Sequence, residues 1–198
     1  MPRVSAEHLA ARRQQILDAA RVCFTRNGFH ATSMQDVIGE AGLSVGAVYR
    51  YFKSKEDLAR AIAGQVIGMI AATLEPMLET SPPVPVDEAM ATVLTALAPQ
   101  LEEDGVFRFA VQVWAESLRN PDLRDLVADV YGTVRDQFVV IARRARDAGH
   151  LPPDADPAAV GSVLFSLVPG YGLQYVWLGT PDRETYLAGL RSLLGSGA

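Results

Sequence analysis

The sequence has few of the residues that form cross-links, metal sites or catalytic triads. Its single cysteine, Cys23, allows no disulfide within the chain and no cysteine-cluster metal site. The three histidines, His8, His30 and His150, have no carboxylate or cysteine partner at the spacing of a metal site or a triad. A glycine-rich phosphate-binding motif is also absent. We therefore predict that the protein is not an enzyme, with no catalytic residue, no metal and no cofactor.

Long apolar runs are missing as well. None reaches the roughly eighteen residues needed to span a bilayer, and the amino end lacks the apolar block of a signal peptide. We expect a cytoplasmic protein without membrane association. Cys23 falls on the predicted apolar face of the first helix, which favours a buried structural thiol over a redox sensor.

Charge is distributed unevenly over the 198 residues, whose net charge is −5. The first sixty residues hold nine Arg or Lys against six acids, while the remainder holds nine Arg against seventeen acids. A basic amino-terminal segment joined to an acidic body is expected when one end of a protein meets phosphate groups and the other does not.

The stretch from Ala31 to Leu58 carries three helix-start signals in succession. Ser33 and Asp36 have the spacing of a capping box, and the helix that they begin ends at Gly42, which can adopt the left-handed conformation. Ser44 is placed to cap a second helix. Ser54 with Asp57 then opens a much longer third helix. Two short helices joined by a glycine-containing turn predict a helix-turn-helix.

The second short helix divides into an inner and an outer side. Val48 and Phe52 lie four residues apart and face inward, and the small residues at the start of the helix allow close approach to a major groove. Arg50 can reach a guanine edge or a phosphate, whereas hydroxyls and the Lys55 ammonium suit phosphate oxygens. The predicted DNA-binding residues are Ser33, Ser44, Val45, Gly46, Ala47, Tyr49, Arg50, Tyr51 and Lys55. The alternative is a helical hairpin with a solvated polar face.

Beyond this stretch, helical periodicity continues to the end and no strand pattern is convincing. Pro76 is expected to bend or end the long third helix, and a proline-rich connector follows at 81–85. The apolar spacing, caps and prolines predict helices over 5–27, 87–98 (closed by Pro99), 106–119, 121–148, 157–178 and 182–194. The helix over 157–178 is apolar on most faces and should be buried on most faces, with a local kink at Pro169-Gly170.

The last two helices carry more apolar surface than a small helical body needs. They form either an internal core or a two-fold interface of four helices with a second copy. Dimerisation is expected independently, because one short recognition helix contacts too few bases, and paired units read half-sites about 34 to 36 Å apart.

Aromatic residues are concentrated in the second half of the chain. Each is individually more typical of plain core, yet Trp and Tyr need hydrogen-bond partners when buried, which suits an apolar cavity with few polar anchors. We hypothesise that a ligand cavity is lined by Trp114, Tyr131, Phe138, Tyr171 and Tyr175.

The helix-turn-helix residues resemble the DNA-binding motif of the TetR family of bacterial transcriptional regulators over about fifty residues. The matching elements are Ser33, Ala41-Gly42-Leu43, Tyr49, Tyr51, Phe52, Lys53, Lys55 and Leu58. The resemblance implies an all-α fold of about nine helices, with a three-helix DNA-binding domain (1–53) followed by a larger ligand-binding and dimerisation domain (54–198).

The resemblance also implies a function. The protein would be a repressor that binds double-stranded operator DNA as a homodimer, and the two copies would pair through their last two helices. A small-molecule inducer would release the DNA by favouring a conformation in which the long helix from Ser54 to Met77 swings. The alternative is a helical small-molecule-binding or partner-binding module without specific DNA binding.

Overall fold

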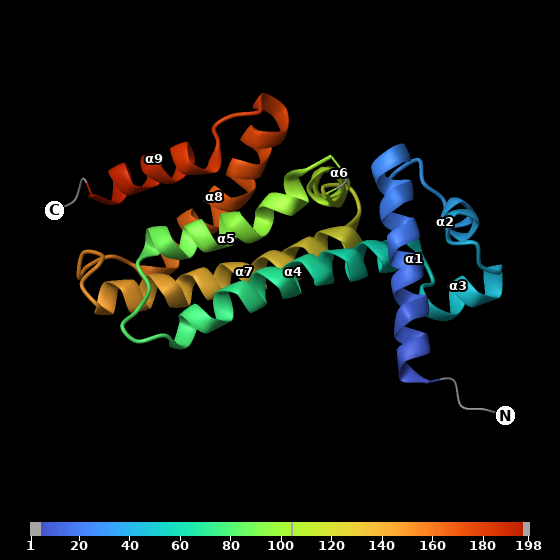
Figure 1. Ribbon diagram of the computed structural model, residues 1–198, viewed down its shortest axis with the longest axis horizontal. Helices are drawn as coiled ribbons and strands as arrows, with labels where there is room; N and C mark the ends of the chain where they lie inside the picture. Colours follow the sequence, from blue (N-terminus) through green and yellow to red (C-terminus); the bar gives the residue numbers. More distant parts are fainter. Residues whose placement is uncertain (1–4, 104, 196–198) are drawn as a thin grey trace. The chain divides into compact units, whose positions relative to one another are not determined.

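Every regular element in the described part of the chain is a helix. The computed structural model describes residues 5–103 and 105–195, and Figure 1 shows the helices in chain order. Over these residues the predicted all-α class and the predicted number of about nine helices are confirmed. The helices are α1 (Ala6–Asn27), α2 (Met34–Ala41), α3 (Val45–Tyr51), α4 (Lys55–Glu79), α5 (Val86–Leu101), α6 (Phe107–Ser117), α7 (Pro121–Asp147), α8 (Pro157–Leu178) and α9 (Arg183–Gly195).

Local capping explains most of the helix ends. Ser5 caps α1 by accepting the His8 N–H at 3.2 Å, and Asp156 caps α8 by accepting the Ala158 N–H at 3.0 Å. Positive φ angles occur at the glycines that follow α1, α2, α7 and α8, where only a residue without Cβ is unstrained. The cap at Gly42 was predicted, because a helix and the glycine that ends it lie only a few positions apart.

Two helices end slightly later than the sequence predicted. α4 ends at Glu79, two residues after the predicted Met77, and α5 continues past Pro99 to Leu101 instead of ending at residue 98. Both prolines lie in the last turn, where a proline removes one backbone hydrogen bond shortly before the helix ends anyway. α6 ends at Ser117, before the predicted Arg119, where the Ser117 hydroxyl donates to the Trp114 carbonyl at 2.7 Å.

The chain divides into two compact units. The first comprises Met1–Gln65 and Val106–Val127, so α6 and the start of α7 join α1, α2, α3 and the start of α4. Its core includes Cys23, a free and buried thiol, and the Phe24 ring, which stacks on Phe109 of α6 at 4.7 Å between centroids. The predicted domain boundary at residues 53 and 54 stays a prediction, because the units follow packing rather than chain order.

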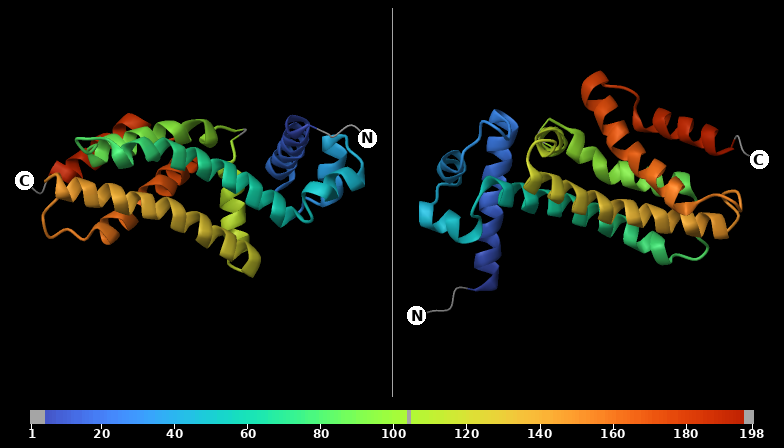
Figure 2. Two further views of the ribbon diagram at one scale, coloured as in Figure 1. Left: turned by 90° about the horizontal axis from the view of Figure 1, so that it is seen from below. Right: turned by 180° about the vertical axis from the view of Figure 1, so that it is seen from behind.

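The second unit comprises Val66–Gly105 and Ala128–Ala198. Within it, α5 packs against α8 and α9 (Figures 1 and 2), and Arg191 of α9 forms an ion pair with Asp87 of α5 at 3.0 Å. The Arg144 guanidinium on α7 donates to the carbonyls of Leu78 and Thr80, the free carbonyl end of α4. A cation at this end of a helix is favoured by the helix dipole.

Helix α8 is less buried than its composition predicted. Val163 is 61% exposed, Trp177 68% and Leu178 68%, and Leu193 on α9 is 77% exposed. The expectation that α8 is buried on most faces is therefore not met within one chain. These four side chains are exposed apolar residues of α8 and α9, and we call them together the α8–α9 surface.

Two helices are long and apolar enough to cross a membrane by length and composition alone. They are α4 and α8, and core helices of globular proteins pass the same test. The expectation that no segment has this length and composition is therefore too strict. That the protein has no membrane association stays a prediction.

Candidate nucleic-acid interface

The start of α2 is fixed by a reciprocal capping box, as predicted. The Asp36 N–H donates to Ser33 Oγ at 3.2 Å, and the Ser33 N–H donates to Asp36 Oδ2 at 2.8 Å. The Ser33 hydroxyl also donates to Asp36 Oδ2 at 2.7 Å. These hydrogen bonds, the hydroxyl's first and then the backbone's, lower the pKa of the Asp36 carboxyl. Gly42 then takes the left-handed conformation, with φ of 64°, and closes α2.

Helix α3 has the two sides that the sequence predicted. Ser44 caps it by accepting the Ala47 N–H at 3.3 Å, and Val48 and Phe52 are buried. On the outer side Val45 is 49% exposed, with Gly46 and Arg50 exposed as well. Ala47, Tyr49 and Tyr51 are half-buried. A seven-residue helix thus presents a narrow, mostly small face that carries one cationic side chain, Arg50.

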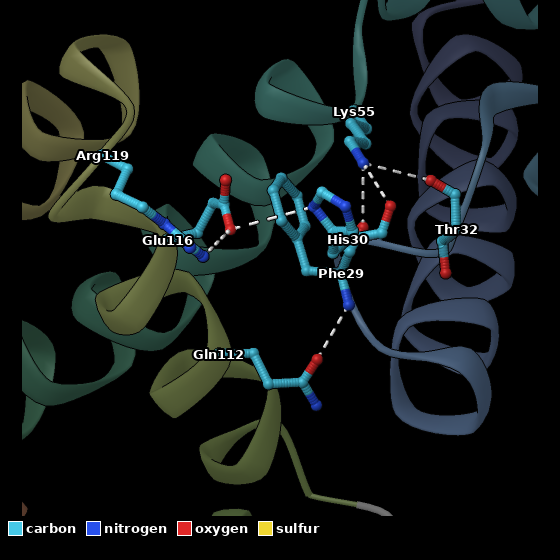
Figure 3. A network of polar contacts seen from close by, with 7 residues as sticks. All are labelled: Phe29, His30, Thr32, Lys55, Gln112, Glu116 and Arg119. Atoms are coloured by element: carbon cyan, nitrogen blue, oxygen red, sulfur yellow. Dashed lines mark hydrogen bonds and ion pairs between the residues drawn. The ribbon is translucent and has the colours of Figure 1, made fainter.

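Both lysines at the start of α4 make hydrogen bonds to backbone carbonyls. The Lys53 ammonium donates to the Tyr49 carbonyl near the end of α3. The Lys55 ammonium donates to the carbonyls of Phe29 at 3.0 Å, His30 at 3.0 Å and Thr32 at 3.3 Å (Figure 3). The phosphate contact that the sequence predicted for Lys55 would have to replace at least one of these bonds.

Helix α6 adds polar contacts to the turn between α1 and α2. Gln112 Oε1 accepts the Phe29 N–H at 2.8 Å, and the Glu116 carboxylate lies 3.9 Å from His30 Nδ1 and 3.3 Å from an Arg119 nitrogen (Figure 3). Sequence reasoning missed Gln112 and Glu116. The only signal in the sequence is one amide, Gln112, placed within an otherwise apolar stretch of α6.

The five predicted ligand-binding residues are divided between the two units. Trp114 belongs to the first unit, where its ring meets Phe107 edge-on at 5.5 Å. The other four belong to the second unit, in which Tyr171 and Tyr175 lie 6.2 Å apart and Tyr131 meets Phe165 at 4.9 Å. Burial raises the pKa of Tyr131 and of Tyr171, and Phe138 is fully buried.

Two family models match the chain. Residues 16–62 match the model described as bacterial regulatory proteins of the tetR family, and residues 85–196 match the BetI-type transcriptional repressor, C-terminal model. The second match alone covers more than half of the chain. The first match contains the whole helix-turn-helix.

Individual relatives agree over nearly the whole length. The chain is 28% identical over 186 residues to the HTH-type transcriptional regulator UidR of Escherichia coli strain K12, covering 92% of this chain and 91% of the relative. The structure of Salmonella enterica GusR matches 98% of both chains with a TM-score of 0.79 at 24% identity. The SmeT–triclosan complex matches 90% of this chain and 91% of that one, with a TM-score of 0.71 at 26% identity.

These matches confirm the resemblance found in the helix-turn-helix and extend it to the carboxyl-terminal helices. The family and the named relatives are transcriptional regulators and not enzymes. The chain belongs to the TetR family of bacterial regulatory proteins, with a carboxyl-terminal region of the BetI-type transcriptional repressors.

Proposed function

We propose that this protein is a transcriptional repressor that binds operator DNA as a homodimer and releases it when a small-molecule inducer binds. The observation that carries the proposal is the outer side of α3, where Val45, Gly46 and Arg50 are exposed above a buried Val48. A helix with small residues at its tip enters a major groove closely, so that one long cationic side chain can reach base edges or phosphates.

Within the proposed interface, Arg50 reads guanine or holds a phosphate, and Val45, Gly46 and Ala47 make short contacts such as those to thymine methyl groups. The hydroxyls of Ser33, Ser44, Tyr49 and Tyr51 hold phosphate oxygens. The Lys55 ammonium also holds a phosphate oxygen, once it has released at least one of the three carbonyls to which it donates.

Fluorescence anisotropy on a labelled fragment of DNA from upstream of the protein's own gene tests the proposal. We expect saturable binding that weakens as salt rises, because each phosphate neutralised adds about −0.9 to the slope of log affinity against log salt. Arg50→Gln should lower affinity, whereas Arg124→Gln, on an exposed part of α7 beside Asp125, should not. Binding that does not saturate, or that does not weaken as the salt concentration rises, would favour the alternative of a helical small-molecule-binding or partner-binding module without specific DNA binding.

The inducer site is proposed to involve Tyr131, Phe138, Tyr171 and Tyr175, the four predicted residues that belong to the second unit. The support is chemical: Tyr171 is a buried phenol and Tyr131 a half-buried one, each within an aromatic cluster, and the related SmeT, a repressor from Stenotrophomonas maltophilia, was solved with triclosan. Compounds that release wild-type protein from its upstream DNA should fail to release a variant with Tyr175→Trp. If release is unchanged by bulky substitutions at these positions, the assignment is wrong.

A further inference from the structure

An amide on α4 is hydrogen-bonded through both of its polar atoms to α1. Gln65 Oε1 accepts a hydrogen bond from the Arg21 guanidinium at 2.7 Å, and Gln65 Nε2 donates to Gln14 Oε1 at 2.8 Å. The Gln14 amide donates in turn to Asp18 Oδ1 at 2.7 Å. These four side chains form one continuous series of hydrogen bonds, which we call the Gln65 ladder, and α4 contributes only Gln65 to it.

The ladder lies where α4 passes from one compact unit to the other. Leu58 and Ile62 of α4 are fully buried, whereas Gln65, one turn later, is half-buried. Gln65 is the last residue of α4 in the first unit, because Val66 belongs to the second. Gln65 therefore holds α4 to α1 at the very end of the segment that the two helices share within the first unit.

The backbone of α4 is least stiff around Gln65. Gly64 and Gly68 lie on either side of it, and both are exposed. A Cβ added to either glycine would meet no atom within 4 Å, so packing does not require glycine there. Glycine in a helix interior is less favourable than alanine and gives the backbone more freedom. The orientation of α4 on α1 thus depends on side-chain contacts, and among the described residues the polar ones are those of Gln65.

The Arg21 guanidinium depends on Gln65 in turn. Its Nε is buried without a hydrogen-bond partner, and within the described part of the chain its bond to Gln65 Oε1 is its only hydrogen bond. Arg21 is itself half-buried. Breaking this bond would leave a half-buried cation without a partner, which is costly, so Arg21 favours the conformation in which Gln65 stays on α1.

We infer that Gln65 is a positioning residue for DNA binding: the ladder fixes the orientation of α4 on α1, and α2 and α3 follow α1. The link from α1 to α2 includes Gln15, which donates to the Ala41 carbonyl at the end of α2 at 2.8 Å. The inference rests on the proposed function, because the two recognition helices of a dimer bind one operator only when their placement matches the half-site spacing.

The test compares the affinity of each variant for two DNA fragments, at a temperature far below unfolding. The first is the protein's own upstream fragment, in which footprinting locates the protected site. The second has one base pair inserted at the centre of that site, which moves one half-site by about 3.4 Å and turns it by about 35°. Wild type should bind the insertion fragment much more weakly than the upstream fragment.

Gln65→Met removes both polar atoms and keeps the length of the side chain. It should bind the upstream fragment about tenfold more weakly than wild type, roughly the worth of one hydrogen bond to a charged group. The ratio of its affinities for the upstream and insertion fragments should be smaller than the wild-type ratio by at least about threefold, because an untied helix adapts to either spacing at an entropic cost.

Two controls separate the ladder from the loss of an amide in general. Gln65→Glu keeps an acceptor for Arg21, and the Gln14 amide can turn to donate to it, so the wild-type ratio should return within about twofold. The added negative charge weakens binding to both fragments alike and cancels in the ratio. Gln15→Met is the matched variant, because Gln15 is the neighbouring amide of α1 but donates to α2. Its ratio should equal that of wild type.

Gln14→Met and Arg21→Met break the ladder from the side of α1. Each should reduce the ratio as Gln65→Met does, and in double variants with Gln65→Met the reductions should not multiply, because all three substitutions break one ladder. Gln14→Met decides the test if Gln65→Met does not fold.

A wild-type ratio in both Gln65→Met and Gln14→Met would overturn the inference, and so would an equal reduction in Gln15→Met. A Gln65→Met variant that only unfolds at a lower temperature would show a merely structural role, and the inference would be wrong. Wild type that binds both fragments equally would overturn it too. Wild type that binds neither fragment would refute the proposed function itself, on which the inference rests.

Discussion

A single glycine, Gly161, allows a close contact between two helices of the second unit. A Cβ added at Gly161 of α8 would lie 2.7 Å from both Cα and the backbone nitrogen of Val139 on α7. Real Cβ atoms do not approach backbone this closely, so one helix would have to move. We predict that Gly161→Ala lowers the free energy of unfolding by about 1 to 3 kcal/mol, as overpacking does.

Gly170, also in α8, is the matched control for Gly161. A Cβ there would meet no atom within 4 Å. Alanine should therefore leave stability unchanged or raise it by up to about 1 kcal/mol through helix propensity. Urea unfolding followed by circular dichroism measures both variants. Equal changes in the free energy of unfolding for the two substitutions would show that helix propensity, and not the contact with Val139, determines the effect of Gly161→Ala.

The roles of single residues could be predicted only where their partners lie nearby in the chain. Ser33, Ser44 and Gly42 could be assigned roles because a cap and its partner lie three or four positions apart. Lys55 is 26 positions from Phe29, and Gln112 is 83 positions from it. No local pattern predicts such pairs, since they exist only after α1, α4 and α6 have packed.

At the scale of an element, the stability of α2 depends on its capping box. Ser33→Ala removes the hydroxyl that accepts the Asp36 N–H, and we predict a loss of about 1 kcal/mol in the free energy of unfolding at neutral pH. Ser5→Ala is the control, because Ser5 caps α1 through His8 without an acidic partner. Chemical unfolding of both variants measures the losses.

The loss of stability caused by Ser33→Ala should depend on pH, because the Ser33 hydroxyl also donates to the ionised Asp36 carboxylate. Hydrogen bonds lower the folded-state pKa of Asp36 below its ordinary value of 3.8. Its contribution to stability is thus complete above that value and disappears as the pH falls through the folded-state pKa. We expect the Ser33→Ala loss to shrink in this acid range while the Ser5→Ala loss stays constant. An NMR titration should show the pKa of Asp36 rising in Ser33→Ala; an unchanged pKa would contradict this account.

Elements were predicted well where local signals define them and less well at prolines. Helices α2 and α3 begin at their predicted caps, but α5 extends past Pro99, which was expected to close it. A proline removes one backbone hydrogen bond from a helix but need not end the helix at the preceding residue, and the sequence alone does not reveal whether it does. The exposed side of α3 was predicted because Val48 and Phe52 fix the inner side by spacing.

At the scale of the whole molecule, the division into two compact units could not be predicted from the sequence. The pattern predicts helices and their apolar faces, but not that α6 and the start of α7 share a compact unit with α1, α2 and α3. That grouping comes from packing of Phe109 on Phe24, two residues far apart in the chain. Family membership shows the class of function, and the α8–α9 surface remains the main feature that one chain leaves uncovered.

We predict that the α8–α9 surface joins two copies in a dimer. Trp177 and Leu193 are more than two-thirds exposed, and burying such side chains is favourable by about 1.5 to 3 kcal/mol each. A two-fold axis brings the same surface of both copies together, so one substitution alters the interface twice. Trp177→Glu and Leu193→Glu should therefore halve the mass measured by light scattering.

Leu118→Glu is the control, because it places a charge on an exposed apolar residue outside the proposed interface. Leu118 is 87% exposed but follows α6 in the first unit, so its charge variant should keep the wild-type mass. The monomeric variants should lose affinity for the upstream DNA at least about tenfold, because two recognition helices on one dimer bind as linked units. A monomeric wild-type protein would contradict this prediction. A Trp177→Glu variant that stays dimeric would also contradict it, because an interface of α8 and α9 would then have to bury one unpaired carboxylate from each copy.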